Sequence, residues 1–277
     1  MKKFTIALLL LVAALTLAAC GRRNEITFGG DDGVVIIGAT AVPHMEILEQ
    51  VLPILLEQGF DVELQEFDNF IAPNIALNDG EICINFFQHR PFLNNFNEEN
   101  DASLVPVFGV HFEPLRVFAG RLDSLDNIPE GAEIAIPEDP SNQARALQLL
   151  EYLGLLTLRT DVSPITATTG IAQNPHNLNI RTLTAQILPQ ILSDVDFAVI
   201  NGNFALQGGV MHLAIDGASE EDNPAAIETF TNFVVVREGY ENSAAVLALV
   251  DAINTQEIRD FIANQYGGRV VPTFIRP

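Results

Sequence analysis

The sequence predicts an α/β protein with two lobes. Short runs of apolar and β-branched residues alternate with stretches of helical spacing, which is typical of strands joined by helices. Two strand-rich blocks lie on either side of residues 110–120, and each block holds a complete set of elements. Residues 34–277 are enough for two lobes of ordinary size, each with its own core.

The N-terminus has the pattern of a secretory signal peptide. Lys2 and Lys3 precede an apolar run over residues 4–17, which is shorter than the roughly 20 residues of a membrane-spanning helix. Leu17-Ala-Ala-Cys20 follows and matches the bacterial lipobox. We therefore expect cleavage after residue 19 and acylation of Cys20, because two or three acyl chains hold a protein stably on a membrane. The alternative is an uncleaved N-terminal membrane helix with a chance cysteine.

The charge of the mature chain is strongly negative. Residues 20–33 are polar and glycine-rich, as expected for a flexible lipidated tether. Both lysines leave with the signal peptide, so 12 arginines face 36 acidic residues, a formal charge of −24. Such a surface repels phosphate backbones and anionic headgroups, which argues against nucleic acid as a partner. We expect the folded part to work on the extracytoplasmic side of the cell membrane.

The first block begins with a buried strand and a helix. Residues 34–37 form a continuous apolar run, which is typical of a strand covered on both faces. Residues 45–58 carry apolar side chains at helical spacing, Pro53 predicts a kink, and Gly59 ends the helix. Cys83 is expected to be a small buried side chain in a strand. Further strands are predicted at 61–67, 82–86 and 104–108, with a short helix at 74–78.

The second block continues the alternation, so we expect largely parallel sheets. Pro140 and Gly154 bracket a predicted helix over residues 141–153. In such folds ligands bind at the carboxyl ends of strands and at helix N-termini, which between two lobes means the cleft. Strands are predicted at 115–118, 133–136, 197–200 and 233–236, and a closing helix pair at 243–253 and 255–265.

Arg145 lies in the first turns of the helix that follows the strand 133–136. Free N–H groups and the helix dipole favour an anion there, and they disfavour an arginine unless it has a purpose. A bidentate hydrogen-bonded ion pair with a ligand carboxylate is one such role. An ion pair with Glu138 or Asp139 on the surface is the alternative.

Two other segments carry polar groups at strand ends. Residues 85–92 combine three phenylalanines with an amide, an imidazole and a guanidinium, which suits the wall of a small-molecule pocket. Core packing of Phe86 and Phe87 is the alternative for this segment. Asn201-Gly-Asn203 follows the strand 197–200 and is either part of a site or an ordinary turn.

The chain carries no catalytic signature that would indicate an enzyme. A Gly-x-Ser-x-Gly elbow, a Walker loop, a Cys-x-x-Cys pair and a His-Glu-x-x-His helix are all missing from the sequence. The five histidines are scattered, and none stands at ligand spacing from another. A metal site that the fold assembles from His44, His89 and His111 is an alternative to a metal-free protein.

These segments together resemble the methionine-binding lipoproteins of ABC importers, the NlpA/MetQ family. The family implies a two-lobed periplasmic-binding-protein fold, type II-like, that closes on a free amino acid in the inter-lobe cleft and delivers it to permease and ATPase subunits. With the signal peptide at 1–19, the lobes would comprise residues 34–115 plus 234–277 and residues 116–233. The resemblance covers residues 34–274 and is specific at 38–49, 73–80, 85–89, 134–147 and 196–203.

The resemblance also implies a set of ligand-binding residues and no cofactor. Arg145 would take the ligand carboxylate, and Asn201 and Asn232 would bind the backbone groups of the amino acid. His89 would lie beside them. Phe70 and Phe87 would enclose the thioether of L-methionine, because sulfur packs favourably on aromatic rings.

Several positions depart from the family pattern. Members often carry tyrosine where this chain has Phe70, Phe86, Phe118 and Phe204, and Arg116 has no family counterpart. Each missing hydroxyl removes a hydrogen-bonding group, so another apolar amino acid or a small methionine-containing peptide stays open as ligand. We expect a non-enzymatic solute-binding lipoprotein. A surface interaction protein that keeps the fold without transport and a metal-binding lipoprotein are the alternatives.

Overall fold

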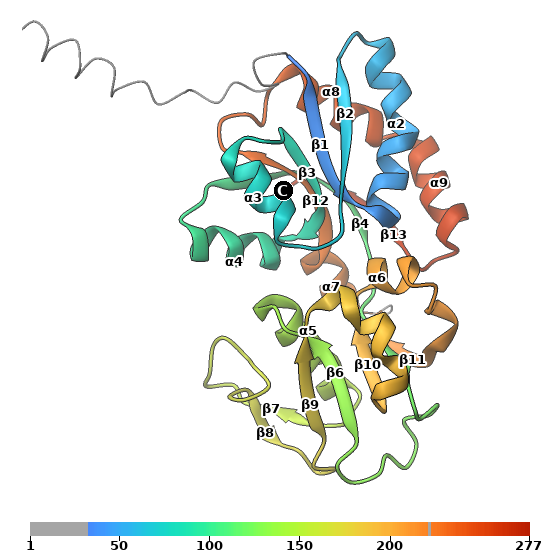
Figure 1. Cartoon of the computed structure of the whole chain (residues 1–277). Helices are drawn as coiled ribbons and strands as arrows, with labels where there is room; N and C mark the ends of the chain where they lie inside the picture. Colours follow the sequence, from blue (N-terminus) through green and yellow to red (C-terminus); the bar gives the residue numbers. More distant parts are fainter. Residues whose placement is uncertain (1–32, 221–222) are drawn as a thin grey trace, which may run out of the picture.

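The computed structural model describes residues 33–220 and 223–277, which form two lobes stacked one above the other (Figure 1). The predicted two-lobed α/β architecture is confirmed. Cys20, the signal peptide and most of the predicted tether lie outside the described residues. Within them, no helix has both the length and the apolar character needed to cross a membrane.

The upper lobe is built on a six-stranded sheet with the order β13-β4-β12-β3-β1-β2. Its strands are β1 (Val35–Thr40), β2 (Val62–Phe67), β3 (Ile84–His89), β4 (Leu104–Phe112), β12 (Thr231–Arg237) and β13 (Val271–Ile275). Its helices are α2 (Glu46–Glu57), α3 (Ala72–Asp79), α4 (Arg90–Asn100), α8 (Ala244–Ile253) and α9 (Gln256–Tyr266), with a π-helical turn at Ala41–Met45 before α2.

The lower lobe is built on a five-stranded sheet with the order β11-β5-β10-β6-β9. Its strands are β5 (Arg116–Ala119), β6 (Glu133–Pro137), β9 (Asn179–Leu183), β10 (Phe197–Ile200) and β11 (Ala214–Ser219), beside a small hairpin of β7 (Thr157–Leu158) and β8 (Ile171–Gln173). Its helical segments are α5 (Pro140–Tyr152), α6 (Gly202–Gln207) and 3-10 segments at Ala185–Asp194 and Met211–Leu213, while α7 (Pro224–Thr229) leads back to the upper lobe.

The continuous apolar strands are buried on both faces, as their sequences predict. In β12, Val234 and Val236 pack with α2, α8 and α9, whereas Phe233 and Val235 pack with α3 and α4 on the other face. Successive side chains of a strand point to opposite faces, so one run of four apolar residues serves two cores. β10 alternates in the same way between the α5 side and the α6 side. Burial of each such side chain contributes about 1.5–3 kcal/mol.

The prediction of largely parallel sheets was wrong. β1 pairs with β2 and β3 in parallel, and β6 pairs with β9 and β10 in parallel. The pairings of β12 with β3 and β4, of β13 with β4, and of β5 with β10 and β11 are antiparallel. The antiparallel strands are mainly those at which the chain crosses between lobes, from β4 into β5 and from β11 back to β12. The alternation of strands and helices in the sequence does not show where the chain crosses between lobes, so these antiparallel pairings could not be predicted from it.

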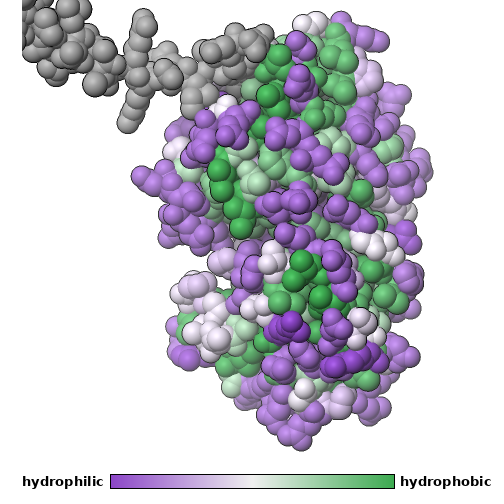
Figure 2. Space-filling view, in the orientation of Figure 1, coloured by the Kyte–Doolittle hydropathy of each residue, from purple (hydrophilic) through white to green (hydrophobic). Residues whose placement is uncertain are grey.

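Most predicted elements are present, but three helices (α4, α6 and α7) and five strands (β7, β8, β9, β11 and β13) were missed. α2 is a single helix with Pro53 inside it, and Cys83 is buried directly before β3. α4 was not predicted, although His89 caps it and Pro91 stands in its first turn. The strands of the upper-lobe sheet lie within residues 35–112 and 231–275, and those of the lower-lobe sheet lie within residues 116–219. The exact lobe boundaries stay a prediction. Figure 2 shows a mainly hydrophilic surface with an indentation between the lobes.

Candidate functional site

A small cavity of about 20 Å³ lies between the two lobes, where strands of both sheets end. That volume is about the room needed for one water molecule. All six side chains predicted to bind the ligand are among its lining residues; their role as ligand contacts stays a prediction. The cavity is lined by Phe70, Phe87, Gln88, His89, Phe92, Glu113, Asn142, Arg145, Asn201, Gly202, Asn203 and Asn232.

His89 is positioned by the junction of β3 and α4. Its Nδ1 accepts the backbone N–H of Phe92 at 3.2 Å, which caps α4. Nδ1 therefore carries no proton, and Nε2 donates to Asn142 Oδ1 at 3.1 Å. Burial, together with the charge of Arg145, lowers the pKa of His89 to about 3. The imidazole is thus a neutral group that links the upper lobe to α5 of the lower lobe.

Asn142 joins three parts of the site. Asp139 caps α5 by accepting the backbone N–H of Asn142 at 2.9 Å, and both carboxylate oxygens of Asp139 accept from the Asn142 side-chain amide at 3.1 Å. The amide oxygen of Asn142 accepts from His89 and from Asn201 Nδ2 at 2.9 Å. The start of α5 therefore orients polar groups of both lobes toward the cavity.

Arg145 is buried, with 3 % of its surface exposed, and it does not pair with Glu138 or Asp139. Its Nε and Nη2 donate to Glu220 Oε2 at 2.9 and 2.7 Å, and Nη2 also donates to the backbone carbonyl of Glu113 at 2.9 Å. The guanidinium lies over the ring of Phe230, 4.1 Å from its centre. The surface ion pair considered from the sequence is thus excluded, and the cation is held at the wall of the cavity.

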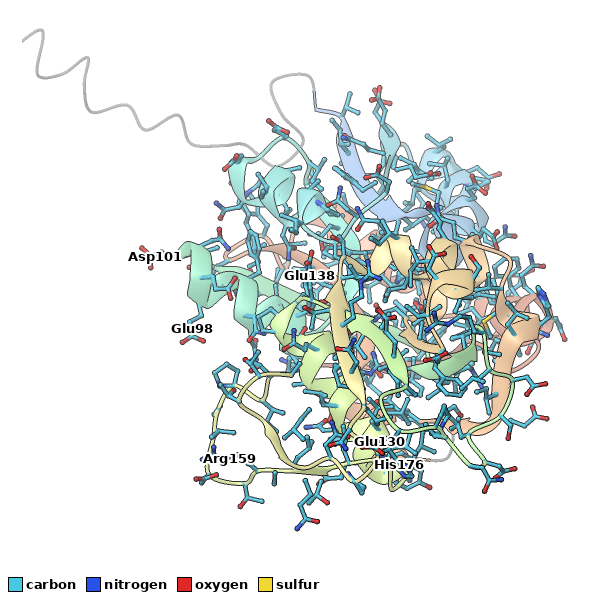
Figure 3. All side chains as sticks on the ribbon, turned by 60° about the horizontal axis from the view of Figure 1, so that its bottom comes forward. Glu98, Asp101, Glu130, Glu138, Arg159 and His176 are labelled. Atoms are coloured by element: carbon cyan, nitrogen blue, oxygen red, sulfur yellow. The ribbon has the colours of Figure 1, made fainter. Side chains whose placement is uncertain are left out.

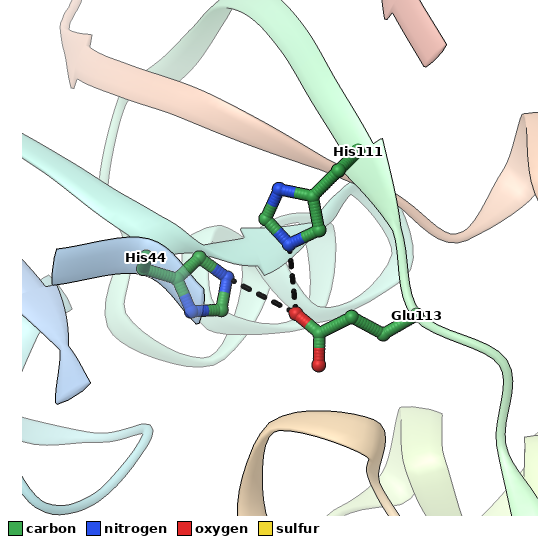
Figure 4. A group of neighbouring side chains, drawn as sticks. All are labelled: His44, His111 and Glu113. Atoms are coloured by element: carbon green, nitrogen blue, oxygen red, sulfur yellow. Dashed lines mark hydrogen bonds and ion pairs between the residues drawn. The ribbon is translucent and has the colours of Figure 1, made fainter. Parts of the chain in front are cut away.

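Glu113 lies at the crossing between the lobes and is held by two histidines (Figure 4). Its Oε1 is 2.8 Å from His111 Nε2 and 3.4 Å from His44 Nε2, and all three side chains are buried. His44 Nδ1 is 2.8 Å from Thr40 Oγ1. A carboxylate oxygen only accepts, so His111 Nε2 carries its proton and donates to Glu113. His44 Nε2 also carries its proton, which points toward Asn232 Oδ1 at 3.3 Å as well as toward Glu113. Neutral imidazoles thus stabilise a carboxylate that faces the cavity.

The pKa values of this cluster follow from burial. Burial is the largest effect on His44 and lowers its pKa to about 3 despite the neighbouring Glu113. Burial alone brings the pKa of His111 to about 3 as well. Burial raises the pKa of Glu113, opposed by His44, by a backbone N–H of Asn203 and by Arg145. A positive charge placed next to Glu113 would therefore stabilise the ionised form of this buried carboxylate.

Two cavity amides have unused hydrogen-bonding groups. Among the described residues, Asn201 Oδ1 and Asn203 Nδ2 are buried side-chain atoms without a hydrogen-bond partner. One is an acceptor and the other a donor. Leaving such a group unpaired costs about 1–3 kcal/mol, and buried orphans call for a ligand or an ordered water. The cavity thus offers Arg145 to an anion and Glu113 to a cation. It also offers a hydrogen-bond donor, Asn203 Nδ2, and a hydrogen-bond acceptor, Asn201 Oδ1.

Phenylalanines close one side of the cavity. Phe70 contacts Phe204, Phe87 and Phe92 with ring centres 4.7, 5.9 and 5.7 Å apart. Phe87 also meets Phe92 edge to face at 5.9 Å. Phe86, by contrast, points into the core of the upper lobe. The alternative of core packing therefore holds for Phe86, whereas Phe87 belongs to the cavity wall.

The metal site considered from the sequence is not assembled as expected. His89 bonds Asn142 and Phe92, away from the pair of His44 and His111. Those two histidines meet Glu113 instead, and their donor atoms lie within 4.8 Å of one another. Two imidazole nitrogens and a carboxylate oxygen form a donor set that zinc accepts. The described residues could hold a divalent cation at this point.

Sequence reasoning missed several lining residues, above all Glu113. Glu113 could have been noticed because it stands two residues after His111, in the stretch that links the predicted strands 104–108 and 115–118. Asn142 and Asn203 lay inside recognised segments but were given no role. Glu220 was missed because it meets Arg145 from 75 positions away.

The fold and this cavity define a two-lobed solute-binding protein, with its site at the junction of the lobes. The model of the NlpA lipoprotein family matches residues 35–274, and the chain belongs to that family, as its motifs predicted. It is 34 % identical to the methionine-binding lipoprotein MetQ of Bacillus subtilis, across 98 % of this chain and 99 % of that protein.

Solved structures agree with this assignment. A nutrient binding protein from Burkholderia cenocepacia bound to methionine superposes with a TM-score of 0.80 at 33 % identity, covering 87 % of this chain and all of that one. A periplasmic substrate-binding protein of an ABC transporter from Coxiella burnetii superposes with a TM-score of 0.78 at 32 % identity, covering 86 % of this chain and all of that one. The chain is similar to both over nearly the whole described fold.

Proposed function

We propose that this chain is the lipid-anchored, extracytoplasmic substrate-binding protein of an ABC importer, and that its ligand is L-methionine or a close apolar amino acid. It would bind the ligand between its lobes and deliver it to the permease and ATPase subunits. Membership of a lipoprotein family supports acylation at Cys20. The methionine named for the Bacillus relative and present in the Burkholderia structure supports the choice of ligand.

The observation that carries this proposal is the pairing of opposite charges in one cavity. Arg145 and Glu113 both line it, and both are buried. A free amino acid is a zwitterion, so its carboxylate would meet the guanidinium and its ammonium would meet Glu113. Asn203 Nδ2 and Asn201 Oδ1 supply the additional donor and acceptor that such a ligand uses. Peptide interiors, sugars and metal ions do not present this combination.

The phenylalanine wall suits the side chain of methionine. Phe70, Phe87 and Phe92 line the cavity and offer aromatic faces and edges without a hydroxyl, and Phe204 packs against Phe70. A thioether packs on aromatic rings with about 0.3–1.5 kcal/mol per contact. Leucine or isoleucine could fill a similar volume but would lack the sulfur contact, so we place methionine first.

Closure of the lobes is the proposed mechanism. A cavity of about 20 Å³ is too small to admit an amino acid, so the lobes must separate before a ligand can enter. The hydrogen bond from His89 to Asn142 joins the lobes in the closed arrangement. A ligand that contacts both lobes would favour that arrangement, which the permease would then recognise.

A thermal unfolding screen of the purified protein tests the ligand. L-Methionine at a hundred times its dissociation constant should add about 2.7 kcal/mol to the free energy of unfolding and raise Tm. The screen should include the other amino acids, zinc and manganese. A shift with zinc or manganese alone would favour the metal-binding function at His44, His111 and Glu113. No shift with any amino acid would contradict the transport function.

Glu113→Gln should weaken methionine binding by about 10- to 100-fold, because the ammonium would lose a charged hydrogen-bond partner. Glutamine keeps an oxygen that can accept from His44 and His111, so the fold should survive. Calorimetric titration measures the change. The control ligand is 4-(methylthio)butanoate, which lacks the amino group and should bind both proteins equally. An equal loss for both ligands would mean that Glu113 acts only through the fold.

A further inference from the structure

The guanidinium of Arg145, which lines the candidate site, already forms an ion pair with a carboxylate of the chain itself, that of Glu220. Glu220 Oε2 accepts from Nε and Nη2 of Arg145, and the two side chains are 7 % and 3 % exposed. Buried pairs of this kind interact strongly because water does not screen them. The proposed carboxylate site of the ligand is thus not a free cation, and any ligand must share Arg145 with Glu220.

The two sides of Arg145 face different spaces. One is the small cavity between the lobes, whose lining includes Arg145 but not Glu220. The other is a groove of about 730 Å³, whose lining includes Arg145, Glu220 and Phe230. Glu220 therefore lines the groove and not the ligand cavity, whereas Arg145 lines both. The contacts with Glu220 and with the Glu113 carbonyl are made by Nε and Nη2 of Arg145, so Nη1 takes no part in them.

Glu220 is fixed in place by the crossing between the lobes. Its Oε2 accepts the backbone N–H of Leu115 at 3.2 Å, and its own backbone N–H donates to the carbonyl of Leu115 at 3.2 Å. Arg145 bonds the carbonyl of Glu113 in the same segment at 2.9 Å. These hydrogen bonds to Leu115 hold Glu220 on the segment that crosses between the lobes. A ligand that enters the cavity would therefore not displace Glu220.

We propose that Glu220 is a built-in counter-charge that shares Arg145 with the ligand and sets the affinity of the site for the ligand carboxylate. This inference rests on the proposed amino-acid function. With Glu220 ionised, the pair is neutral, and the ligand carboxylate is held by hydrogen bonds rather than by net charge. Removal of the negative charge leaves an uncompensated buried guanidinium that attracts a carboxylate more strongly. Glu220 therefore tunes the site toward easier release.

Glu220→Gln tests this role, because glutamine keeps an acceptor for Arg145 and removes the charge. Titrate the wild type and the variant with L-methionine and with L-methioninamide, which has the same side chain but no carboxylate. The dissociation constant for methionine should fall by about tenfold, as expected for loss of a like charge a few ångströms away. The value for methioninamide should not fall, so the ratio of the two constants changes by about tenfold.

The matched control is Glu98→Gln, the same change at an exposed position on α4, which Figure 3 shows pointing away from the molecule. It should leave both constants unchanged. If Glu220→Gln does not fold, Glu220→Ser removes the same charge and is titrated in its place. An unchanged ratio, or an equal loss for both ligands, would overturn the role of Glu220 and leave the proposed function standing. A wild type that binds neither ligand would overturn both.

Discussion

Arg145→Ala is expected to abolish amino-acid binding while the protein stays folded. Within residues 33–220 and 223–277, Arg145 is the only lysine or arginine that lines the cavity, and no lysine follows Lys3 in the sequence. Truncation of one partner in a buried charged contact costs about 2–5 kcal/mol, which corresponds to roughly a 30-fold to several-thousand-fold loss of affinity. Calorimetric titration with L-methionine measures the loss, and circular dichroism reports the fold.

The design must separate lost binding from lost stability. Arg145→Ala leaves Glu220 buried without its partner, and an uncompensated buried charge destabilises a protein by about 3–5 kcal/mol. The double variant Arg145→Ala with Glu220→Gln removes both charges and should recover most of that stability without recovering binding. Arg159→Ala, at an exposed surface pair, is the control that should bind normally. Binding that survives in the double variant would show that the ligand carboxylate lies elsewhere.

Local sequence and the family resemblance together located six of the twelve residues that line the cavity. Arg145 follows β6 in the first turns of α5, His89 ends β3, and Asn201 directly follows β10. Polar residues at the ends of apolar strands are informative because the carboxyl ends of strands gather at one edge of a sheet. That rule and the resemblance to a family predicted six residues that line one cavity, and their role in ligand binding stays a prediction. Whether they bind a ligand is for the titrations to decide.

Partners distant in sequence could not be predicted. Glu113 meets His44 across 69 positions, and Glu220 meets Arg145 across 75. Each pair depends on how the chain crosses between lobes, which is also why the antiparallel strands were missed. Acidic residues are abundant in this chain, so nothing in composition distinguishes two buried carboxylates from the many exposed ones. Burial and pairing, rather than residue type, identify them.

Acid is expected to destabilise the protein steeply between pH 6 and pH 4. His44, His89 and His111 have pKa values of about 3 in the folded protein, against 6.5 as the ordinary value. In this window the unfolded chain therefore binds more protons than the folded one, so the free energy of unfolding falls as pH falls. Each histidine contributes up to about 1.4 kcal/mol per pH unit.

Two buried carboxyl groups oppose this trend. Burial raises the pKa values of Glu113 and Asp139, so the folded protein holds protons there that the unfolded chain has released, which favours the fold as pH falls. Three histidines against two carboxyl groups leave a net loss of about 1–4 kcal/mol per pH unit. Denaturant unfolding at pH 7, 6, 5 and 4.5 measures the slope.

A single substitution separates the histidine effect from general acid unfolding. His111→Gln keeps a donor beside Glu113 and removes one titrating group, so the unfolding free energy should depend less steeply on pH by up to about 1.4 kcal/mol per unit. His212→Gln, at an exposed histidine, should leave the slope unchanged. Parallel curves for the wild type and His111→Gln would mean that the pKa of His111 is not lowered in the folded protein. The donor arrangement around Glu113 would then have to differ, because a protonated imidazole would form a charged pair with that carboxylate.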